Sequence, residues 1–159
     1  MKPFDDIGYA KVDLDRFRRQ GAVETIYGEG KSAGQIAGIF ASLSDAGQKP
    51  VLVTRLDAAK NEQLQKLATP EYSYFPVARI GRLGEALAPS GHGTIAVACA
   101  GTSDIPVAEE AAISAETLGN KVARFYDVGV AGLHRLMACE DSLREASVVV
   151  AVAGMEGAL

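Results

Sequence analysis

The sequence has few of the residues that would fasten a small protein covalently or through a metal ion. It contains two cysteines, Cys99 and Cys139, which lie far apart without a Cys-X-X-Cys pair, and two histidines, so a structural zinc site has little support. Cys99 lies in an apolar, strand-like stretch. We expect it to be a reduced core residue, because buried thiols away from positive charge are usually inert.

Long apolar runs and an excess of positive charge are also absent. No apolar stretch approaches the roughly 18 residues that span a bilayer, and the N-terminus is charged where a signal peptide would be apolar. Residues 1–90 carry 12 basic and 11 acidic side chains, whereas residues 91–159 carry 4 and 9. A nucleic-acid surface needs a basic stripe. We therefore interpret the chain as cytoplasmic, with neither a membrane nor a nucleic acid as its partner.

The 159 residues, 48% of them apolar, are enough for one or two small domains with a buried core. The composition changes at "LGEALAPSGHGT" (83–94), where Gly, Pro and Ser cluster as they do in a linker. We therefore expect a small N-terminal α/β segment over residues 1–89 and a second domain over residues 90–159.

The pattern of the first segment predicts three helices, one that stops at Gly21 and two with Ser32 and Asp57 as their N-caps. The stretches "ETIYGEGK" and "PVLVTRL" between them are typical of short strands. The apolar residues that carry the helical spacing are Leu14, Phe17, Ile36, Ala37, Phe40, Leu43, Leu64 and Leu67, the last two expected to face inward.

The second segment alternates strands and helices. Strands are predicted over 94–101, 121–129 and 146–154, and helices over 104–118 and 131–145. This βαβαβ order predicts a parallel, flavodoxin-like α/β sheet covered by helices in three layers. The sequence stops at Leu159, where a further helix is expected, so we expect a C-terminally incomplete domain with uncovered strands and an unpaired edge.

All three strands run into glycine-containing turns, and ligands of open α/β sheets bind outside the carboxyl ends of the strands. The first turn, "AGTSD", offers Gly101, the hydroxyls of Thr102 and Ser103, and Asp104 as a helix N-cap. Two interpretations are open here. The turn suits an anion such as phosphate at a helix start, and it is equally ordinary capping chemistry, since neither named nucleotide fingerprint is present.

The second turn, "DVGVAGLHR", contains Asp127, Gly129, Gly132, His134 and Arg135. A lone histidine is more often packed or exposed than catalytic, but this one follows a glycine turn at a strand end, where it could point into the crevice. The arginine either binds a phosphate or carboxylate or lies in solvent.

The third turn, "AGMEGAL", contains Gly154, Met155, Glu156 and Gly157. An acidic residue among apolar ones on a tight turn suggests a ligand contact or a proton-transfer group, and the alternative is an exposed loop carboxylate.

Taken together, "AGTSDIPVAEEAAISAETLGN", "YDVGVAGLHRL" and "VVVAVAGMEGAL" resemble the LarB family, the synthase that begins the biosynthesis of the nickel-pincer cofactor in lactate racemase maturation. That family is similar to the aminoimidazole ribonucleotide carboxylases of purine synthesis. Their Gly-Ser-x-Ser-Asp, Ser-Ala-His-Arg and glycine-rich motifs correspond in position to 101–104, 132–135 and 154–157. The stretches "DRFRRQGAVETIYGEGK", "PVLVTR" and "FPVARIG" also look like the family, so the resemblance covers nearly the whole chain.

The resemblance implies carboxylation of the pyridinium ring of nicotinic acid adenine dinucleotide by carbon dioxide or bicarbonate. It also implies hydrolysis of the phosphoanhydride, which releases AMP and leaves a biscarboxylated pyridinium mononucleotide. Neither biotin nor ATP is implied, whereas magnesium is expected to polarise the phosphate oxygens during hydrolysis. Related carboxylases form their sites between subunits, so a homo-oligomer is expected.

The resemblance also suggests roles for the turns. Gly101 to Asp104 would hold a phosphate or ribose, His134 and Arg135 would orient the diphosphate or a carboxylate, and Glu156 would manage a proton as aromaticity is restored. Further substrate contacts are expected from Asp127, Gly129, Gly132, Gly154, Met155 and Gly157.

One departure from the family concerns cysteine. The family's catalytic cysteine, which attacks the pyridinium ring, lies in a distal part not found here, and neither cysteine of this chain matches its motif. We therefore expect a fragment of a longer enzyme or a truncated homologue. The alternatives are an aminoimidazole ribonucleotide carboxylase and a noncatalytic nucleotide-binding or assembly module. Tyr27, Gly28 and Lys31 form either a functional turn or a structural hairpin.

Overall fold

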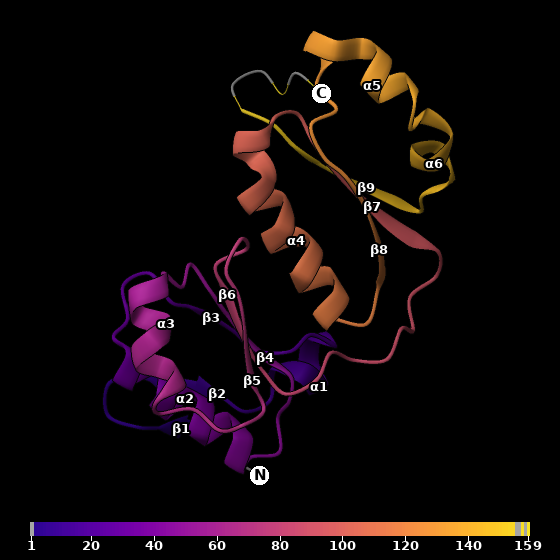
Figure 1. Ribbon diagram of the computed structural model, residues 1–159. Helices are drawn as coiled ribbons and strands as arrows, with labels where there is room; N and C mark the ends of the chain where they lie inside the picture. The colour runs from indigo at the N-terminus through magenta and orange to yellow at the C-terminus, as the bar shows by residue number, and fades with distance from the viewer. Residues whose placement is uncertain (1, 155–156, 158) are drawn as a thin grey trace. The chain divides into compact units, whose positions relative to one another are not determined.

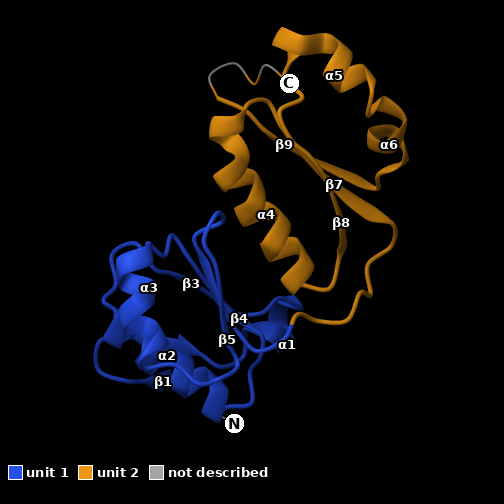
Figure 2. Ribbon diagram, viewed as in Figure 1, with its two compact units in different colours: residues 1–85 blue, residues 86–159 orange. Residues whose placement is uncertain are grey.

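The computed structural model describes residues 2–154, 157 and 159, and the chain divides into two compact units. Unit 1 comprises residues 1–85 and unit 2 comprises residues 86–159 (Figure 2). The linker-like stretch before Pro89 belongs to unit 2, since the Leu87 N–H donates to the Thr117 carbonyl at 3.1 Å. Within the described residues, no helix combines the length and the apolar character that crossing a membrane requires.

Unit 1 contains a mixed four-stranded sheet with the order β3-β4-β6-β5 (Figure 1). β3 (Thr25–Tyr27) and β4 (Val51–Thr54) run parallel, and the helical connection between them provides the long crossover that a parallel pair needs. β6 (Ile80–Leu83) pairs antiparallel with β4 and with β5 (Tyr72–Phe75). The sequence pattern predicts the first two of these strands, and it does not predict the β5–β6 hairpin.

The two longer helices of unit 1 begin at the predicted caps. α2 (Ala33–Asp45) follows Ser32, whose hydroxyl accepts from the Gln35 N–H at 3.2 Å while the Gln35 side chain accepts from the Ser32 N–H at 2.9 Å. α3 (Ala58–Gln65) follows Asp57, whose carboxylate accepts a backbone N–H at 2.7 Å. Both predictions are confirmed, because a side-chain oxygen satisfies a donor that the first helical turn leaves open.

The core of unit 1 lies between these helices and the sheet. Ile36 and Leu43 of α2 are fully buried, as predicted, and so is Leu64 of α3. The prediction for Leu67 is wrong, since its side chain is 59% exposed. The reason is that α3 ends at Gln65, so the helical spacing does not extend to that residue.

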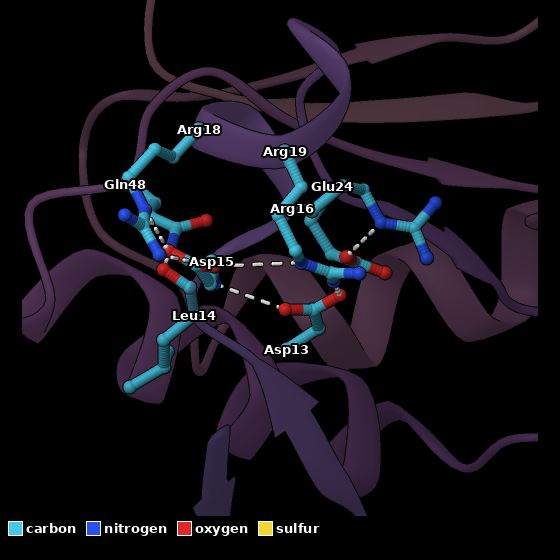
Figure 3. A network of polar contacts seen from close by, with 8 residues as sticks. All are labelled: Asp13, Leu14, Asp15, Arg16, Arg18, Arg19, Glu24 and Gln48. Atoms are coloured by element: carbon cyan, nitrogen blue, oxygen red, sulfur yellow. Dashed lines mark hydrogen bonds and ion pairs between the residues drawn. The ribbon is translucent and has the colours of Figure 1, made fainter. Parts of the chain in front are cut away.

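A hairpin and a short helix lead into this sheet. β1 (Phe4–Asp6) and β2 (Lys11–Asp13) pair antiparallel, and α1 (Arg16–Gln20) ends at Gly21, whose φ of 65° is left-handed, as the sequence predicts. Figure 3 shows that the arginines of α1 are engaged by carboxylates. The ion pairs are Arg16–Glu24 at 2.6 Å, Arg18–Asp15 at 2.7 Å and Arg19–Asp13.

Unit 2 has the predicted parallel α/β sheet. Its strands are β7 (Thr94–Cys99), β8 (Lys121–Phe125) and β9 (Val148–Val152), in the order β8-β7-β9. This is the 2-1-3 order of flavodoxin-like sheets, in which the winding direction reverses between the first and third strands. The switch point therefore lies between β7 and β9.

Helices cover this sheet from two sides. α4 (Ile105–Thr117) packs on one face, where Val97, Cys99, Ala108 and Ala112 form a buried cluster. The two crossovers run in opposite directions along the sheet, so right-handed connections place their helices on opposite faces. Figure 1 shows α5 (Leu133–Met137) and α6 (Glu140–Glu145) on the side away from α4.

The prediction of one helix over 131–145 is wrong, because the structure has α5 and α6 there. The charges explain the division. Arg135 lies in the last turn of α5, whereas Glu140 and Asp141 lie in the first turn of α6. These charges complement the dipoles of their own helix ends, whereas one continuous helix would place the two acids in its interior.

β9 forms one edge of the sheet. Val148 and Val149 are 51% and 49% exposed. Among the described residues, no strand pairs with the outer side of β9.

Candidate functional site

The candidate site lies at the carboxyl ends of β7, β8 and β9, beside the switch point of the sheet. Backbone hydrogen bonds continue past the strand ends and join the turns there. The Ala100 N–H donates to the Val152 carbonyl at 3.0 Å, and the Gly129 N–H donates to the Ala100 carbonyl at 2.9 Å. A third bond, from Val128 to the Cys99 carbonyl, measures 3.0 Å. The first turn is thus bonded to the second turn and to the end of β9, where the third turn begins.

The first turn is closed by its own aspartate. The Asp104 carboxylate accepts the Gly101 N–H at 2.9 Å, and the Asp104 N–H donates to the Gly101 carbonyl at 3.0 Å. Asp104 stands at the N-cap position of α4, as predicted, but its side chain makes no capping bond to that helix. The predicted capping bond is therefore wrong, because the carboxylate turns back to Gly101. Thr102 and Ser103 are exposed and start a helical segment, where backbone N–H groups have no partner inside the helix.

The predicted site glycines fall into two groups. A Cβ on Gly129 would lie 2.7 Å from the Ala100 carbonyl oxygen, so glycine is required there for the second turn to contact the first. A Cβ on Gly101 would lie 3.7 Å from its nearest neighbour, and one on Gly154 would meet no described residue within 4 Å. Neither of the latter two has a left-handed φ. Packing and conformation therefore leave Gly101 and Gly154 unexplained, and a close approach by a ligand is a reason for glycine at both positions.

The second turn holds Arg135 in a fixed place. Asp127, with a left-handed φ of 58°, forms an ion pair with the Arg135 guanidinium. The arginine side chain folds back over Gly132, where a Cβ would lie 2.5 Å from Nε. His134 is exposed and adjacent in sequence to Arg135, so the two side chains leave α5 in different directions. The turn therefore presents one oriented guanidinium, already paired with a carboxylate.

The thiol beneath these turns is buried. Cys99 is fully buried, and its Sγ lies 3.5 Å from the Gly101 carbonyl oxygen. Burial raises the pKa of the Cys99 thiol, and the nearby carboxylates of Asp104 and Asp127 raise it further. Since the thiolate is the nucleophilic form, Cys99 has a structural role, as predicted. Both cysteines are free thiols.

The described part of the site carries more negative than positive charge. Asp104 and Asp127 are its carboxylates, and Arg135 is its arginine. Within residues 2–154, 157 and 159, no group of three or more His, Cys, Asp and Glu side chains could hold a metal ion. The uncharged donors of the first turn include the N–H groups and hydroxyls of Thr102 and Ser103.

The structure brings together most of the predicted site residues. Gly101 to Asp104 are hydrogen-bonded to the turn with Gly129, and Asp127 and Arg135 lie next along that turn. Gly157 has a left-handed φ of 73°, and Met155 and Glu156 lie outside the described residues. Sequence reasoning missed Ala100, whose backbone joins the turns. The sequence signal that could have identified Ala100 is a small residue placed between the end of a strand and a glycine.

Comparison with known proteins identifies the family. Residues 4–85, which are nearly the whole of unit 1, match the model of the LarB/PurE-like N-terminal domain. This chain belongs to the LarB/PurE-like family. It is also 34% identical over 169 aligned positions to an uncharacterised protein of Methanocaldococcus jannaschii. The alignment covers 94% of this chain, so the relative has counterparts of both units, and the chain spans 60% of the length of that relative.

Proposed function

We propose that this LarB/PurE-like chain takes part in carboxylating the pyridinium ring of nicotinic acid adenine dinucleotide. Carbon dioxide or bicarbonate supplies the carboxyl group, and hydrolysis of the phosphoanhydride releases AMP. The observation that carries this proposal is the bonded junction of the first two strand-end turns with the end of β9 at the switch point of unit 2. Ligands of open parallel sheets bind at such a point, and Ala100 is bonded there to Gly129 and Val152.

The turn residues have distinct roles in this proposal. Thr102 and Ser103 hold a phosphate or a ribose of the dinucleotide through their N–H groups and hydroxyls. Asp104 keeps their turn closed through its bond to Gly101. Gly101 and Gly154 leave room for the ligand, since among the described residues no atom lies closer than 3.7 Å to the place of either missing Cβ.

The second turn orients the negatively charged end of the substrate. Arg135, fixed by Asp127, binds a phosphate or carboxylate, because a guanidinium forms paired hydrogen bonds with such groups. His134, exposed on α5, contacts the diphosphate from another direction. Glu156 remains the proposed proton-transfer group on sequence grounds.

The phosphates of the substrate are better ligands for magnesium than the side chains of this site. The Asp104 carboxylate already accepts the Gly101 N–H, and the Asp127 carboxylate already forms an ion pair with Arg135. Magnesium commonly binds through substrate phosphates with few protein ligands. We therefore propose that it enters with the dinucleotide, and we derive no step that uses it.

The test is a product assay with protein expressed from its native reading frame. Nicotinic acid adenine dinucleotide, magnesium and ¹³C-bicarbonate are added, and mass spectrometry follows AMP and the labelled carboxylated mononucleotide. A parallel reaction contains aminoimidazole ribonucleotide. Label in the pyridinium product supports the proposal, whereas label in the aminoimidazole product alone, or in neither, contradicts it.

A variant pair connects the reaction to the site. Thr102→Ala/Ser103→Ala removes both hydroxyls of the first turn and should weaken dinucleotide binding about tenfold or more, since hydrogen bonds to charged groups are worth roughly 1.5–3 kcal/mol each. Ser142→Ala removes an exposed hydroxyl from α6 and should leave binding unchanged. Equal binding by both variants would remove the first turn from the site.

A further inference from the structure

Unit 1 contains another pair of parallel strands whose carboxyl ends lie side by side. Tyr27 at the end of β3 is in register with Thr54 at the end of β4. The Gly28 N–H donates to the Thr54 carbonyl at 2.9 Å, and a Cβ on Gly28 would lie 2.7 Å from that oxygen. The turn that follows β3 is therefore pressed against the end of β4. We call this place the β3–β4 edge.

Basic residues from four places in the sequence have their backbone on the turns at the β3–β4 edge. Lys31 lies in the turn after β3, Arg55 directly follows β4, and Lys60 lies in the first turn of α3. Arg79 directly precedes β6, and its carbonyl accepts the Leu56 N–H at 2.8 Å. The acidic residues of these turns are Glu29 and Asp57. The edge thus has four basic residues and two acidic ones, unlike the site in unit 2.

The two acidic side chains have other partners. Glu29 accepts the Tyr27 hydroxyl, and Asp57 caps α3. The Lys60 ammonium lies at the ion-pair limit of 4.0 Å from Asp57, and it donates instead to the neutral carbonyls of Gly28 at 2.7 Å and Glu29 at 3.0 Å. Its side chain is only 16% exposed. The Lys60 charge is therefore held in a partly buried place without a carboxylate at hydrogen-bond distance.

Lys31 is held in the same way. Its ammonium donates to the Tyr27 carbonyl at 2.9 Å, so two lysines bond to three consecutive carbonyls of one turn. Each ammonium has three donors, and these bonds use one donor of Lys31 and two of Lys60. Against the described part of the chain, donors therefore remain on both cations. Tyr27, whose carbonyl accepts from Lys31, is itself 56% exposed.

We propose that the β3–β4 edge is a second binding site, for the phosphate groups of an organic phosphate. Lys31 and Lys60 supply the remaining ammonium donors, and Arg79 adds positive charge from the neighbouring turn. Charge-assisted hydrogen bonds of this kind are the strong ones in phosphate recognition. The site belongs to unit 1 alone and is independent of the reaction proposed above.

The test is calorimetric titration of the full chain with inorganic pyrophosphate and with ADP at low salt. Lys31→Met and Arg79→Asn each remove one positive charge from the edge, and asparagine tolerates the left-handed φ of 53° at position 79. Each should weaken pyrophosphate binding about tenfold or more. Lys66→Met, an exposed charge at the far end of α3, is the matched control and should leave binding unchanged. No binding by the wild-type chain, or equal binding by all variants, overturns the proposal.

Backbone amide NMR of the same titrations locates the ligand. Pyrophosphate should shift the Gly28 to Lys31 amide resonances, and it should do so equally in Thr102→Ala/Ser103→Ala. Tighter binding of ADP than of pyrophosphate would identify a nucleotide as the source of the phosphate, and equal binding would identify phosphate alone. Shifts confined to the unit 2 turns overturn this site without affecting the reaction. Shifts at the edge in a chain that does not carboxylate leave this site standing.

Discussion

Gly129→Ala tests the contact that joins the first two turns. The added Cβ would lie 2.7 Å from the Ala100 carbonyl oxygen and 3.2 Å from two further Ala100 backbone atoms. All three are backbone atoms, so no side chain can move aside, and the turns must separate by a few tenths of an ångström. The φ of −64° and ψ of 155° suit alanine, so the cost comes from packing alone.

The expected destabilisation of unit 2 is about 1–3 kcal/mol, the usual cost of overpacking, part of it from weakening the Gly129–Ala100 hydrogen bond. Amide hydrogen exchange in β7, the central strand, measures the free energy of opening of unit 2. Gly101→Ala is the matched control. Its Cβ has room, and a compatible Gly→Ala change typically stabilises by about 0.4–1 kcal/mol.

The two substitutions should therefore change stability in opposite directions, and only Gly101→Ala should weaken dinucleotide binding without destabilising the fold. A Gly129→Ala protein as stable as the wild type would refute the close approach of the turns. An equal loss of stability in both variants would refute the division of the glycines into packing and ligand positions.

Three further predictions follow from named contacts. Asp127→Asn removes a carboxylate from the side of Arg135, so dinucleotide affinity should rise several-fold at low salt and less at high salt, whereas Arg135→Gln should lower it; the opposite order in a titration would contradict the role of this pair. Burial raises the pKa of Glu24 above its ordinary 4.5, with Arg16 opposing, so its contribution to stability is complete below pH 4.5 and is lost as pH rises through the folded-state value. Unfolding measurements between pH 4 and 7 should show this fall in the wild type and a smaller one in Glu24→Gln, and parallel curves would count against it. A thiol reagent should label partly exposed Cys139 in the native chain and Cys99 only after unfolding, and equal labelling rates by peptide mass spectrometry would disprove the burial of Cys99.

The elements that could be predicted from sequence are those that local chemistry specifies. Ser32 and Asp57 cap α2 and α3 through their own side chains, and Gly21 ends α1 through its left-handed φ. The strands of unit 2 are apolar runs separated by helical spacing, and the parallel order follows from their alternation.

The elements that were missed depend on distant partners. The strands of the β1–β2 and β5–β6 hairpins have three or four residues each, which is too short for a periodic signal, and they exist because they pair with another strand. Leu67 shows the same limit, since its exposure depends on where α3 ends.

The sequence predicted which turns form the candidate site, but it did not predict the contacts that their side chains make. The parallel topology alone brings the carboxyl ends of the strands together. Predicting the strands was therefore enough to predict that the turns with Gly101 and Gly129 lie side by side. The return of Asp104 to Gly101 and the pairing of Asp127 with Arg135 depend on side-chain rotamers, which no local pattern specifies.

The β3–β4 edge likewise combines residues that could be predicted from the sequence with residues that could not. The turn from Tyr27 to Lys31 could be singled out in the sequence as a candidate functional turn. Lys60 and Arg79 could not be added to it, since they reach the edge only through the packing of α3 and the pairing of β6 with β4.

Hydrogen exchange of the full chain with and without nicotinic acid adenine dinucleotide tests the central claim most directly. Binding at the switch point of unit 2 should slow exchange in residues 100–104 and 127–132, because the ligand covers the N–H groups of these two turns. Unchanged exchange in both turns at a saturating concentration of the dinucleotide would contradict the proposed site.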